Sequence, residues 1–229
     1  TCIICMCRNF FCHAVRIRIN LTGPVPSQKG NLMSRIEKDF LGEKHIPENA
    51  YYGVQTQRGK DNFHITGIPM SSEPYFVKAF GYVKKAAALA NRDLGVLDPA
   101  IADAIVFACD QLIAGGYRDQ FVTDFIQGGA GTSTNMNANE VIANIALEKL
   151  GHKKGEYQYI HPNDHVNYGQ STNDVYPTAV RLTVLRACPE LIEAQRLLMH
   201  ALLAKAERTD NEVEADAYLM KAQQLATLA

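Results

Sequence analysis

GGAGTSTNMNANE, residues 128–140, opens the segment that decides the fold, because here a glycine-rich loop runs into a helical pattern. Its glycines allow backbone angles that other residues avoid, so amide N–H groups can turn toward one point. Thr132, Ser133 and Thr134 bring hydroxyl groups to the same place, and we expect a Ser or Thr to cap the following helix. The positive end of that helix then faces the loop and suits an anion.

A second hydroxyl-rich loop, HPNDHVNYGQSTNDVYPT, occupies residues 161–178 and repeats this arrangement. Ser171, Thr172 and Asn173 precede a long apolar-periodic segment, with Pro177 near its first turn. Two loops of this kind together suit a substrate with two carboxylates. The alternative is that these residues are plain helix N-caps and turn residues, which is their commonest use.

Both stretches resemble one known family. GGAGTSTNMNANEVIAN (128–144) and GHKKGEYQYIHPNDHVNYGQSTNDVYPT (151–178) are similar to the first signature region of the fumarase/aspartase superfamily. GAGTS at 129–133 and QSTN at 170–173 resemble its aspartase branch more than its fumarase branch, which reads GSGTQ and QSSND at these places. The resemblance extends upstream through AYYGVQTQR (50–58) and downstream to about residue 207.

The resemblance implies a mainly α fold, made of the N-terminal domain of the aspartase/fumarase fold and the first long helix of its central helical bundle. It also implies a homotetramer in which three subunits build each active site. The implied reaction is the elimination of ammonia from L-aspartate to give fumarate, an ammonia-lyase activity. Two alternatives stay open: a class II-type fumarate hydratase, and a non-catalytic helical oligomerisation domain.

The substrate-binding residues that the resemblance implies are Thr132, Ser133, Ser171, Thr172 and Asn173. Removing a proton beside a carboxylate builds negative charge on that carboxylate, and positioned hydrogen-bond donors stabilise the charge. The catalytic base of the superfamily is a serine on a GSSxMPxKxNP loop, a text that this sequence does not contain. We therefore expect no catalytic residue in this chain, and we interpret it as an N-terminal portion of the enzyme that is inactive alone.

The resemblance implies no metal ligands and no cofactor, and it leaves activation by a divalent cation open. The turn HPND at 161–164 nevertheless invites a metal interpretation, since it gathers His, Asn and Asp. We prefer a turn with local hydrogen bonds, because these residues favour turns. In related fumarases this turn belongs to a secondary anion site, so the resemblance adds a modulatory anion site at His161, Asn163 and Asp164.

The first residues differ from the rest of the chain. Residues 1–33 match nothing in the family, and they carry candidate zinc ligands at Cys2, Cys5, Cys7, Cys12 and His13. All of these candidates fall within a dozen residues, whereas structural zinc sites usually separate two ligand pairs by a longer spacer. We therefore interpret residues 1–32 as upstream sequence with a natural start at Met33, and we count residues 1–33 as an N-terminal extension outside the family.

The remaining sequence divides into three parts. Residues 34–170 form the N-terminal lyase domain and open with an extended, turn-rich arm, in which Arg58 pairs with either a substrate carboxylate or a surface carboxylate. Residues 171–207 start the helical-bundle domain, with a kink or break expected at Pro189. Residues 208–229 are a helix-compatible tail outside the resemblance.

Composition excludes several classes of function. Hydrophobic residues make up 47% and charged residues 21%, which is ordinary for a soluble globular protein. The formal net charge is -1 with no basic block in the main body, so we expect no nucleic-acid partner. No apolar run is long enough to span a membrane. The main body has only two cysteines, Cys109 and Cys188, both in helical patterns, which favours the cytoplasm.

Overall fold

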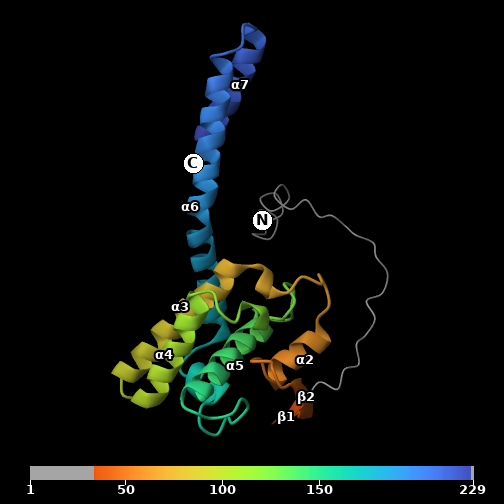
Figure 1. The fold of residues 1–229 in the computed structure, drawn as a ribbon, viewed down its shortest axis with the longest axis vertical. Coiled ribbons are helices and arrows are strands. Elements are labelled where there is room, and N and C mark those ends of the chain that lie inside the picture. Colours follow the sequence, from red (N-terminus) through yellow and green to blue (C-terminus); the bar gives the residue numbers. More distant parts are fainter. Residues whose placement is uncertain (1–33, 228–229) are drawn as a thin grey trace. The chain divides into compact units, whose positions relative to one another are not determined.

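The computed structural model describes residues 34–227, and this part of the chain is mainly helical, as expected (Figure 1). The predictions made for residues 1–33 lie outside the described residues. Along the chain the elements are β1 (Ser34–Asp39), β2 (Gly42–Pro47), α2 (Val54–Asn62), η1 (Met70–Ser72), α3 (Pro74–Asp93), α4 (Pro99–Ile113), η2 (Arg118–Gln120), α5 (Thr132–Lys149), η3 (Pro162–Val166), α6 (Thr172–Ala206) and α7 (Glu212–Ala226).

Helix α5 lies at the centre of this arrangement. Every residue from 137 to 147 is buried, because α2, α4, α6 and the π-helical turn η3 all pack against the helix. Val141, Ile142 and Ile145 contribute apolar side chains to the core, as their spacing predicts. In Figure 1 this green helix lies between α4 and α2.

The polar side chains of α5 are buried as well, and they bind the backbone of surrounding loops. Asn137 Oδ1 accepts from Val122 N (3.0 Å), and its Nδ2 donates to Gln120 O (2.9 Å). Asn144 Nδ2 donates to Tyr51 O (2.7 Å), and its Oδ1 accepts from Gly155 N (2.8 Å). These side chains satisfy loop N–H and C=O groups that would otherwise be buried without partners.

Glu140, also on α5, caps the neighbouring helix α2. Its carboxylate accepts from Gly53 N (2.8 Å), Gln55 N (2.8 Å), Thr56 N (3.0 Å) and Thr56 Oγ1 (2.6 Å). The N-cap residue of α2, Gly53, supplies no side-chain bond of its own. Burial raises the pKa of Glu140 to about 7, an effect opposed by the bonds from Thr56 and Gln55. A side chain distant in sequence therefore completes the start of α2.

Helices α3 and α4 each begin at a residue that favours a helix start. Pro74 occupies the first turn of α3, where its missing N–H needs no partner. Asp98 Oδ1 caps α4 by accepting from Ala100 N (2.8 Å) and Ile101 N (3.2 Å). The two helices pack side by side (Figure 1), with Phe80 and Ile105 fully buried in the core.

The predicted extended arm at the start is instead an antiparallel hairpin followed by a helix. Strands β1 and β2 pair in register from Ser34 opposite Pro47 to Asp39 opposite Gly42, and α2 follows them. Arg58 on α2 forms a forked pair with Asp39, through Nη2–Oδ1 (2.7 Å) and Nε–Oδ2 (2.8 Å). The ion-pair interpretation of Arg58 is thereby confirmed, and its guanidinium holds the hairpin against α2.

Helix α6 runs without interruption from Thr172 to Ala206, so a break at Pro189 is wrong. A proline inside a helix removes one backbone hydrogen bond, namely to the carbonyl four residues earlier. Pro189 and Leu185 are both exposed, so water can take the place of the lost partner. The N-terminal part of α6 packs on α3, and α7 runs back along α6 (Figure 1).

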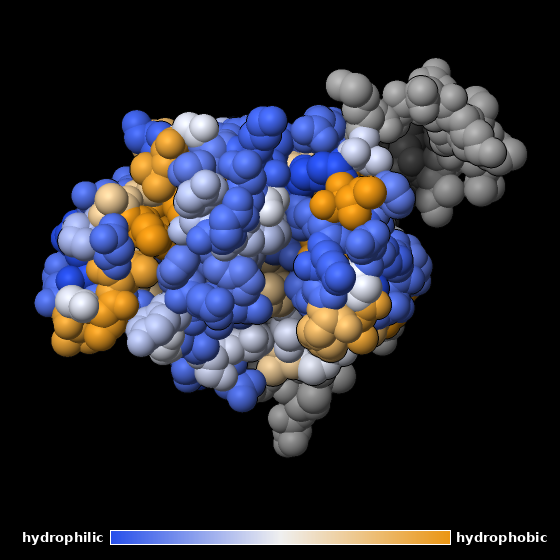
Figure 2. All heavy atoms as spheres, turned by 90° about the horizontal axis from the view of Figure 1, so that it is seen from below, coloured by the Kyte–Doolittle hydropathy of each residue, from blue (hydrophilic) through white to orange (hydrophobic). Residues whose placement is uncertain are grey.

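The surface is mostly hydrophilic on the face that Figure 2 shows, where apolar side chains form separate patches. The two C-terminal helices expose the longest series of large apolar residues, which comprises Val180, Val184, Leu185, Leu191, Ile192, Leu197, Leu198, Val213, Leu219 and Met220. Within residues 34–227, no helix combines the length and the apolar character that crossing a membrane requires.

Candidate functional site

The first loop ends in a helix start that differs from the predicted one. The N-cap of α5 is Gly131, at φ 89°, and no side chain of its own caps the helix, so the expected Ser or Thr cap is wrong. The side chain of Gln127 takes the role of the cap. Gln127 Oε1 accepts from Thr134 N (2.7 Å), and Gln127 Nε2 donates to Asp124 O (3.2 Å). The glycine conformation lets the loop turn, and an upstream side chain satisfies the helix N-terminus.

The three hydroxyl residues of this loop point to different places. Thr134 is buried and shares a hydrogen bond with Thr123 (Oγ1–Oγ1, 3.0 Å). Ser133 lies against α2, since a Cβ built at Gly59 would be 3.0 Å from its Cβ. Thr132 is exposed, and its side chain makes no hydrogen bond within residues 34–227. Thr132 is therefore the most exposed of the three.

Asp124 fixes the segment that leads into this loop. Its carboxylate accepts from Thr66 N (2.9 Å), Thr66 Oγ1 (2.8 Å), Gly67 N (2.8 Å) and Ile126 N (2.8 Å). Desolvation raises the pKa of Asp124, but these bonds outweigh it and lower the pKa to about 2, from 3.8. A lowered folded-state pKa stabilises the fold above the unfolded value, and this stabilisation is lost as the pH falls through the folded value.

We expect Asp124→Asn to lower the unfolding free energy at pH 6, because the carboxylate that accepts these bonds is lost. The difference from the unaltered chain should shrink as the pH falls from about 4 to about 2, the window between the two pKa values. Urea unfolding at several pH values measures this difference. Asp119→Asn is the control, since Asp119 is exposed and accepts only from Gln120 Nε2 (2.7 Å). Equal losses for both variants would contradict the prediction.

The second loop starts α6 with a capping box. Ser171 Oγ accepts from Asn173 N (3.2 Å), and the Asp174 carboxylate accepts from Ser171 N (3.3 Å). The capping interpretation is thus confirmed for Ser171. Asn173 is exposed, and its side chain has no hydrogen-bond partner in the described part of the chain. At this helix start the free polar side chain is therefore that of Asn173.

The two loops meet at the N-termini of α5 and α6. Asn135 Nδ2, on the first turn of α5, donates to Thr172 Oγ1 (3.1 Å), on the first turn of α6. Gly131 also packs against the ring of Tyr176, because a Cβ built there would lie 2.1 Å from Tyr176 Cδ2. The structure therefore brings together the two segments that carry Thr132 and Asn173, as the resemblance implies.

A family model described as "Lyase" matches residues 42–214. The chain belongs to this lyase family, the fumarase/aspartase superfamily. Among curated relatives, an "Aspartate ammonia-lyase" of Helicobacter pylori is 54% identical over 173 residues, or 76% of this chain and 37% of the relative. One of Pseudomonas aeruginosa is 57% identical over 172 residues, or 75% of this chain and 36% of the relative.

Solved structures of superfamily members have the same fold. A fumarate lyase:delta crystallin from Brucella melitensis bound to cobalt superposes with a TM-score of 0.80 at 45% identity, covering 85% of this chain and 45% of that one. A class II fumarase from Schistosoma mansoni superposes with a TM-score of 0.76 at 30% identity, covering 85% and 44%. The chain thus spans less than half the length of these superfamily members.

A lysine that the sequence analysis missed lies beneath the junction of the two superfamily loops. Lys84 Nζ, on α3, donates to Asn167 Oδ1 (2.7 Å) and Gln170 Oε1 (3.0 Å). Asn167 Oδ1 also accepts from Asn135 Nδ2 (3.2 Å). The sequence does contain a signal for this lysine. Lys84 is a charged residue at a core-facing position of α3, four residues after Phe80 and four before Ala88.

The close approach of the loops gives a further prediction. We expect Gly131→Ala to lower the unfolding free energy by about 3 kcal/mol, through the left-handed backbone and the clash with Tyr176. Gly151→Ala is the matched control, because Gly151 has φ +84° and nothing within 4 Å of a built Cβ. It should lose only about 1 kcal/mol, the backbone contribution. Thermal or urea unfolding measures both, and equal losses would mean that the Tyr176 contact is unimportant.

The HPND turn forms local hydrogen bonds, as preferred from the sequence. His161 Nδ1 accepts from Asn163 N (3.3 Å) and Asp164 N (3.1 Å), while His161 N donates to His165 Nδ1 (2.9 Å). Asp164 Oδ2 also lies 3.1 Å from His161 Nδ1. The secondary anion site at His161, Asn163 and Asp164 stays a prediction.

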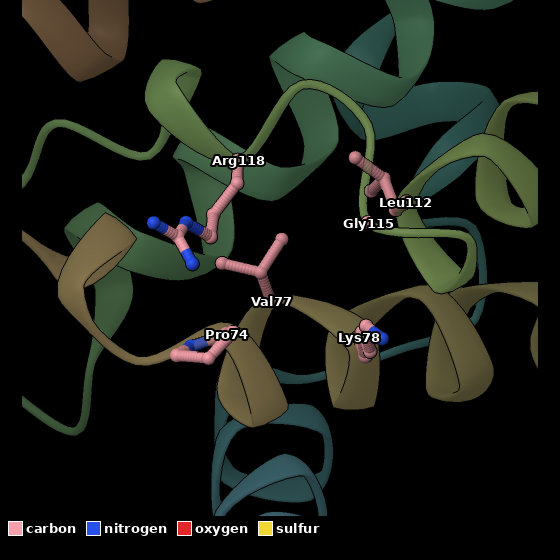
Figure 3. A pocket seen from close by; sticks show the side chains of 6 residues that line it. All are labelled: Pro74, Val77, Lys78, Leu112, Gly115 and Arg118. Carbon is pink, nitrogen blue, oxygen red and sulfur yellow. The ribbon is translucent and has the colours of Figure 1, made fainter.

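A separate cavity of about 160 Å³ lies between α3 and the end of α4 (Figure 3). It is lined by Pro74, Val77, Lys78, Leu112, Gly115 and Arg118, none of which belongs to either loop. Among residues 34–227, no three His, Cys, Asp or Glu side chains are grouped so that they could hold a metal ion.

Proposed function

We propose that this chain carries the substrate-binding loops of an aspartate ammonia-lyase, which eliminates ammonia from L-aspartate to give fumarate. The observation that carries the proposal is the Asn135–Thr172 hydrogen bond (3.1 Å), which joins the starts of α5 and α6. Two helix N-termini that meet offer N–H groups and positive dipole ends to an anion. Identities of 54% and 57% to curated aspartate ammonia-lyases support the assignment of the reaction.

The proposed roles follow from which side chains are free. Thr132 and Asn173 are exposed without partners in residues 34–227, so each can donate to a substrate carboxylate. Thr172 Oγ1 accepts from Asn135, which leaves its own O–H free to donate. Such donors act most strongly when proton removal builds charge on the adjacent carboxylate. Ser133 and Ser171 take supporting positions, the first against Gly59 and the second as the cap of α6.

The base of this reaction is assigned to the superfamily's serine loop, which has no counterpart in residues 1–229. We further propose that the active enzyme is a cytoplasmic homotetramer. The exposed apolar residues of α6, such as Val184, Leu185 and Leu197, support burial against other helices. Free Cys109 and Cys188 support a reducing compartment. We propose no cofactor, and assays with and without Mg²⁺ or a chelator test activation by a divalent cation.

A class II-type fumarate hydratase is the second candidate function. It is supported by the 30% sequence identity to the class II fumarase of Schistosoma mansoni. The third is a non-catalytic helical domain that associates with full-length subunits. The aspartase proposal is favoured because identity to curated aspartate ammonia-lyases is much higher.

A chimeric enzyme tests the proposal. Residues 42–207 replace the matching segment of the Helicobacter pylori relative, which supplies the rest of the fold. We expect fumarate formation from L-aspartate and consumption of fumarate that depends on ammonium. Ammonium-independent conversion of fumarate would support the hydratase instead. A folded tetramer without turnover of either substrate would support the non-catalytic domain, and the unmodified relative is the control.

A further inference from the structure

Lys84 is a buried lysine without a counter-ion. Its side chain is fully buried, and no carboxylate in the described part of the chain lies within ion-pair distance of Nζ. The acceptors are two neutral amide oxygens, those of Asn167 and Gln170. The next residue differs, since Lys85 is partly exposed and pairs with Asp110 (Nζ–Oδ1, 2.7 Å). Burying an ammonium group without an opposite charge is unfavourable, so this arrangement calls for a reason beyond packing.

The hydrogen bonds of Lys84 converge on the substrate loops. Asn167 and Gln170 lie in the segment that ends at Ser171, the cap of α6. Asn167 Oδ1 accepts from both Lys84 Nζ (2.7 Å) and Asn135 Nδ2 (3.2 Å), and the same Nδ2 donates to Thr172 Oγ1 (3.1 Å). Asn135 Oδ1 is buried and has no partner within residues 34–227. Lys84 Nζ is therefore connected to the hydroxyl of Thr172 through three successive hydrogen bonds.

The surroundings of Lys84 leave its charge unneutralised. The titratable group of α4 that acts on it is Cys109, whose thiol is neutral because burial raises its pKa to about 12. Desolvation lowers the pKa of Lys84 to about 7. An anion bound at the start of α6 would be the nearest compensating charge that this arrangement offers, and it would favour the protonated amine.

We propose that Lys84 is a positioning residue of the substrate site: its amine holds the segment from Asn167 to Gln170 in place, and its protonated form attracts a dicarboxylate to the joined helix N-termini. Lys84 does not touch the substrate. It acts through Asn167, Gln170 and Asn135, and through its charge, which falls off slowly in a buried setting. The inference rests on the proposed function.

The test uses the active chimera with Lys84→Met, which keeps the length of the side chain and removes the charge. We expect the KM for L-aspartate and the inhibition constant of succinate, a dicarboxylate, each to rise roughly ten-fold or more, as expected for the loss of a nearby buried charge. Lys85→Met is the matched control and should leave both constants within about two-fold, since exposed ion pairs contribute little. A purely structural role would lower the yield of folded enzyme and leave the constants of the folded fraction unchanged.

A second measurement needs no variant. Succinate binding to the unaltered chimera at about pH 7.5 is measured by calorimetry in two buffers of different ionisation enthalpy. The difference between the two binding enthalpies gives the number of protons that the protein takes up on binding. Uptake supports the proposal, because a bound anion raises the pKa of Lys84, and the absence of uptake overturns it. Equal constants for Lys84→Met and Lys85→Met in an active chimera also overturn it. An unaltered chimera that turns over no aspartate contradicts the proposed function itself, and the inference with it.

Discussion

Replacing Glu140 by Ala is expected to lower the free energy of unfolding by about 4 kcal/mol or more, since every buried donor left without a partner costs about 1–3 kcal/mol. The carboxylate accepts four hydrogen bonds at the start of α2, from the backbone of Gly53, Gln55 and Thr56 and from the Thr56 hydroxyl. Thr56 and Gly53 are themselves buried, so water does not replace the lost acceptor. Urea unfolding measures the loss.

Glu148→Ala is the control for this prediction, because Glu148 lies on the same helix but is exposed. It accepts a single hydrogen bond, from Tyr51 Oη (2.6 Å), and should lose less than about 1 kcal/mol. Similar losses for Glu140→Ala and Glu148→Ala would show that the start of α2 is stable without its distant cap.

The capping of α2 also explains what the sequence could not predict. Helices α3, α4 and α6 have local sequence signals, namely apolar residues at helical spacing and a favourable starting residue: Pro74, Asp98 and Ser171, respectively. Helix α2 has no such signal, since Gly53 provides no side-chain cap and Glu140 lies 84 residues beyond Thr56. The hairpin before it is likewise held by a distant contact, that of Arg58 with Asp39. Structure that depends on partners far along the chain leaves little trace in a local pattern.

In the candidate site, too, some features could be predicted from local sequence and others could not. Both loops could be located from the sequence, by their composition and by the family resemblance, because glycines and hydroxyl residues before a helix form a motif of neighbouring residues. The residues that join the loops were not singled out, since Lys84 meets Asn167 and Gln170 across 83 and 86 residues of sequence. Local reasoning also misplaced the cap of α5, where Gln127 serves in place of a Ser or Thr. The domain boundaries at 170 and 207 stay predictions.

Replacing Thr132 by Ala in the chimera is expected to separate substrate binding from stability. Thr132 is exposed and has no partner within residues 34–227, so the loss of its hydroxyl should change the unfolding free energy by less than about 0.5 kcal/mol. If its O–H donates to the carboxylate that gains charge, turnover should fall by roughly 10²–10³. Steady-state kinetics and thermal unfolding of the same preparation measure the two effects.

Ser171→Ala provides the contrasting variant. Ser171 Oγ accepts from Asn173 N (3.2 Å), so its removal is expected to cost about 1 kcal/mol of stability, the usual loss for an N-cap. A fall in turnover for Ser171→Ala that matches the fall for Thr132→Ala would show that Ser171 also donates to substrate. Near-normal turnover of Thr132→Ala would remove Thr132 from the site. In that case the exposed amide of Asn173 and the O–H of Thr172, both at the start of α6, would be the donors that remain.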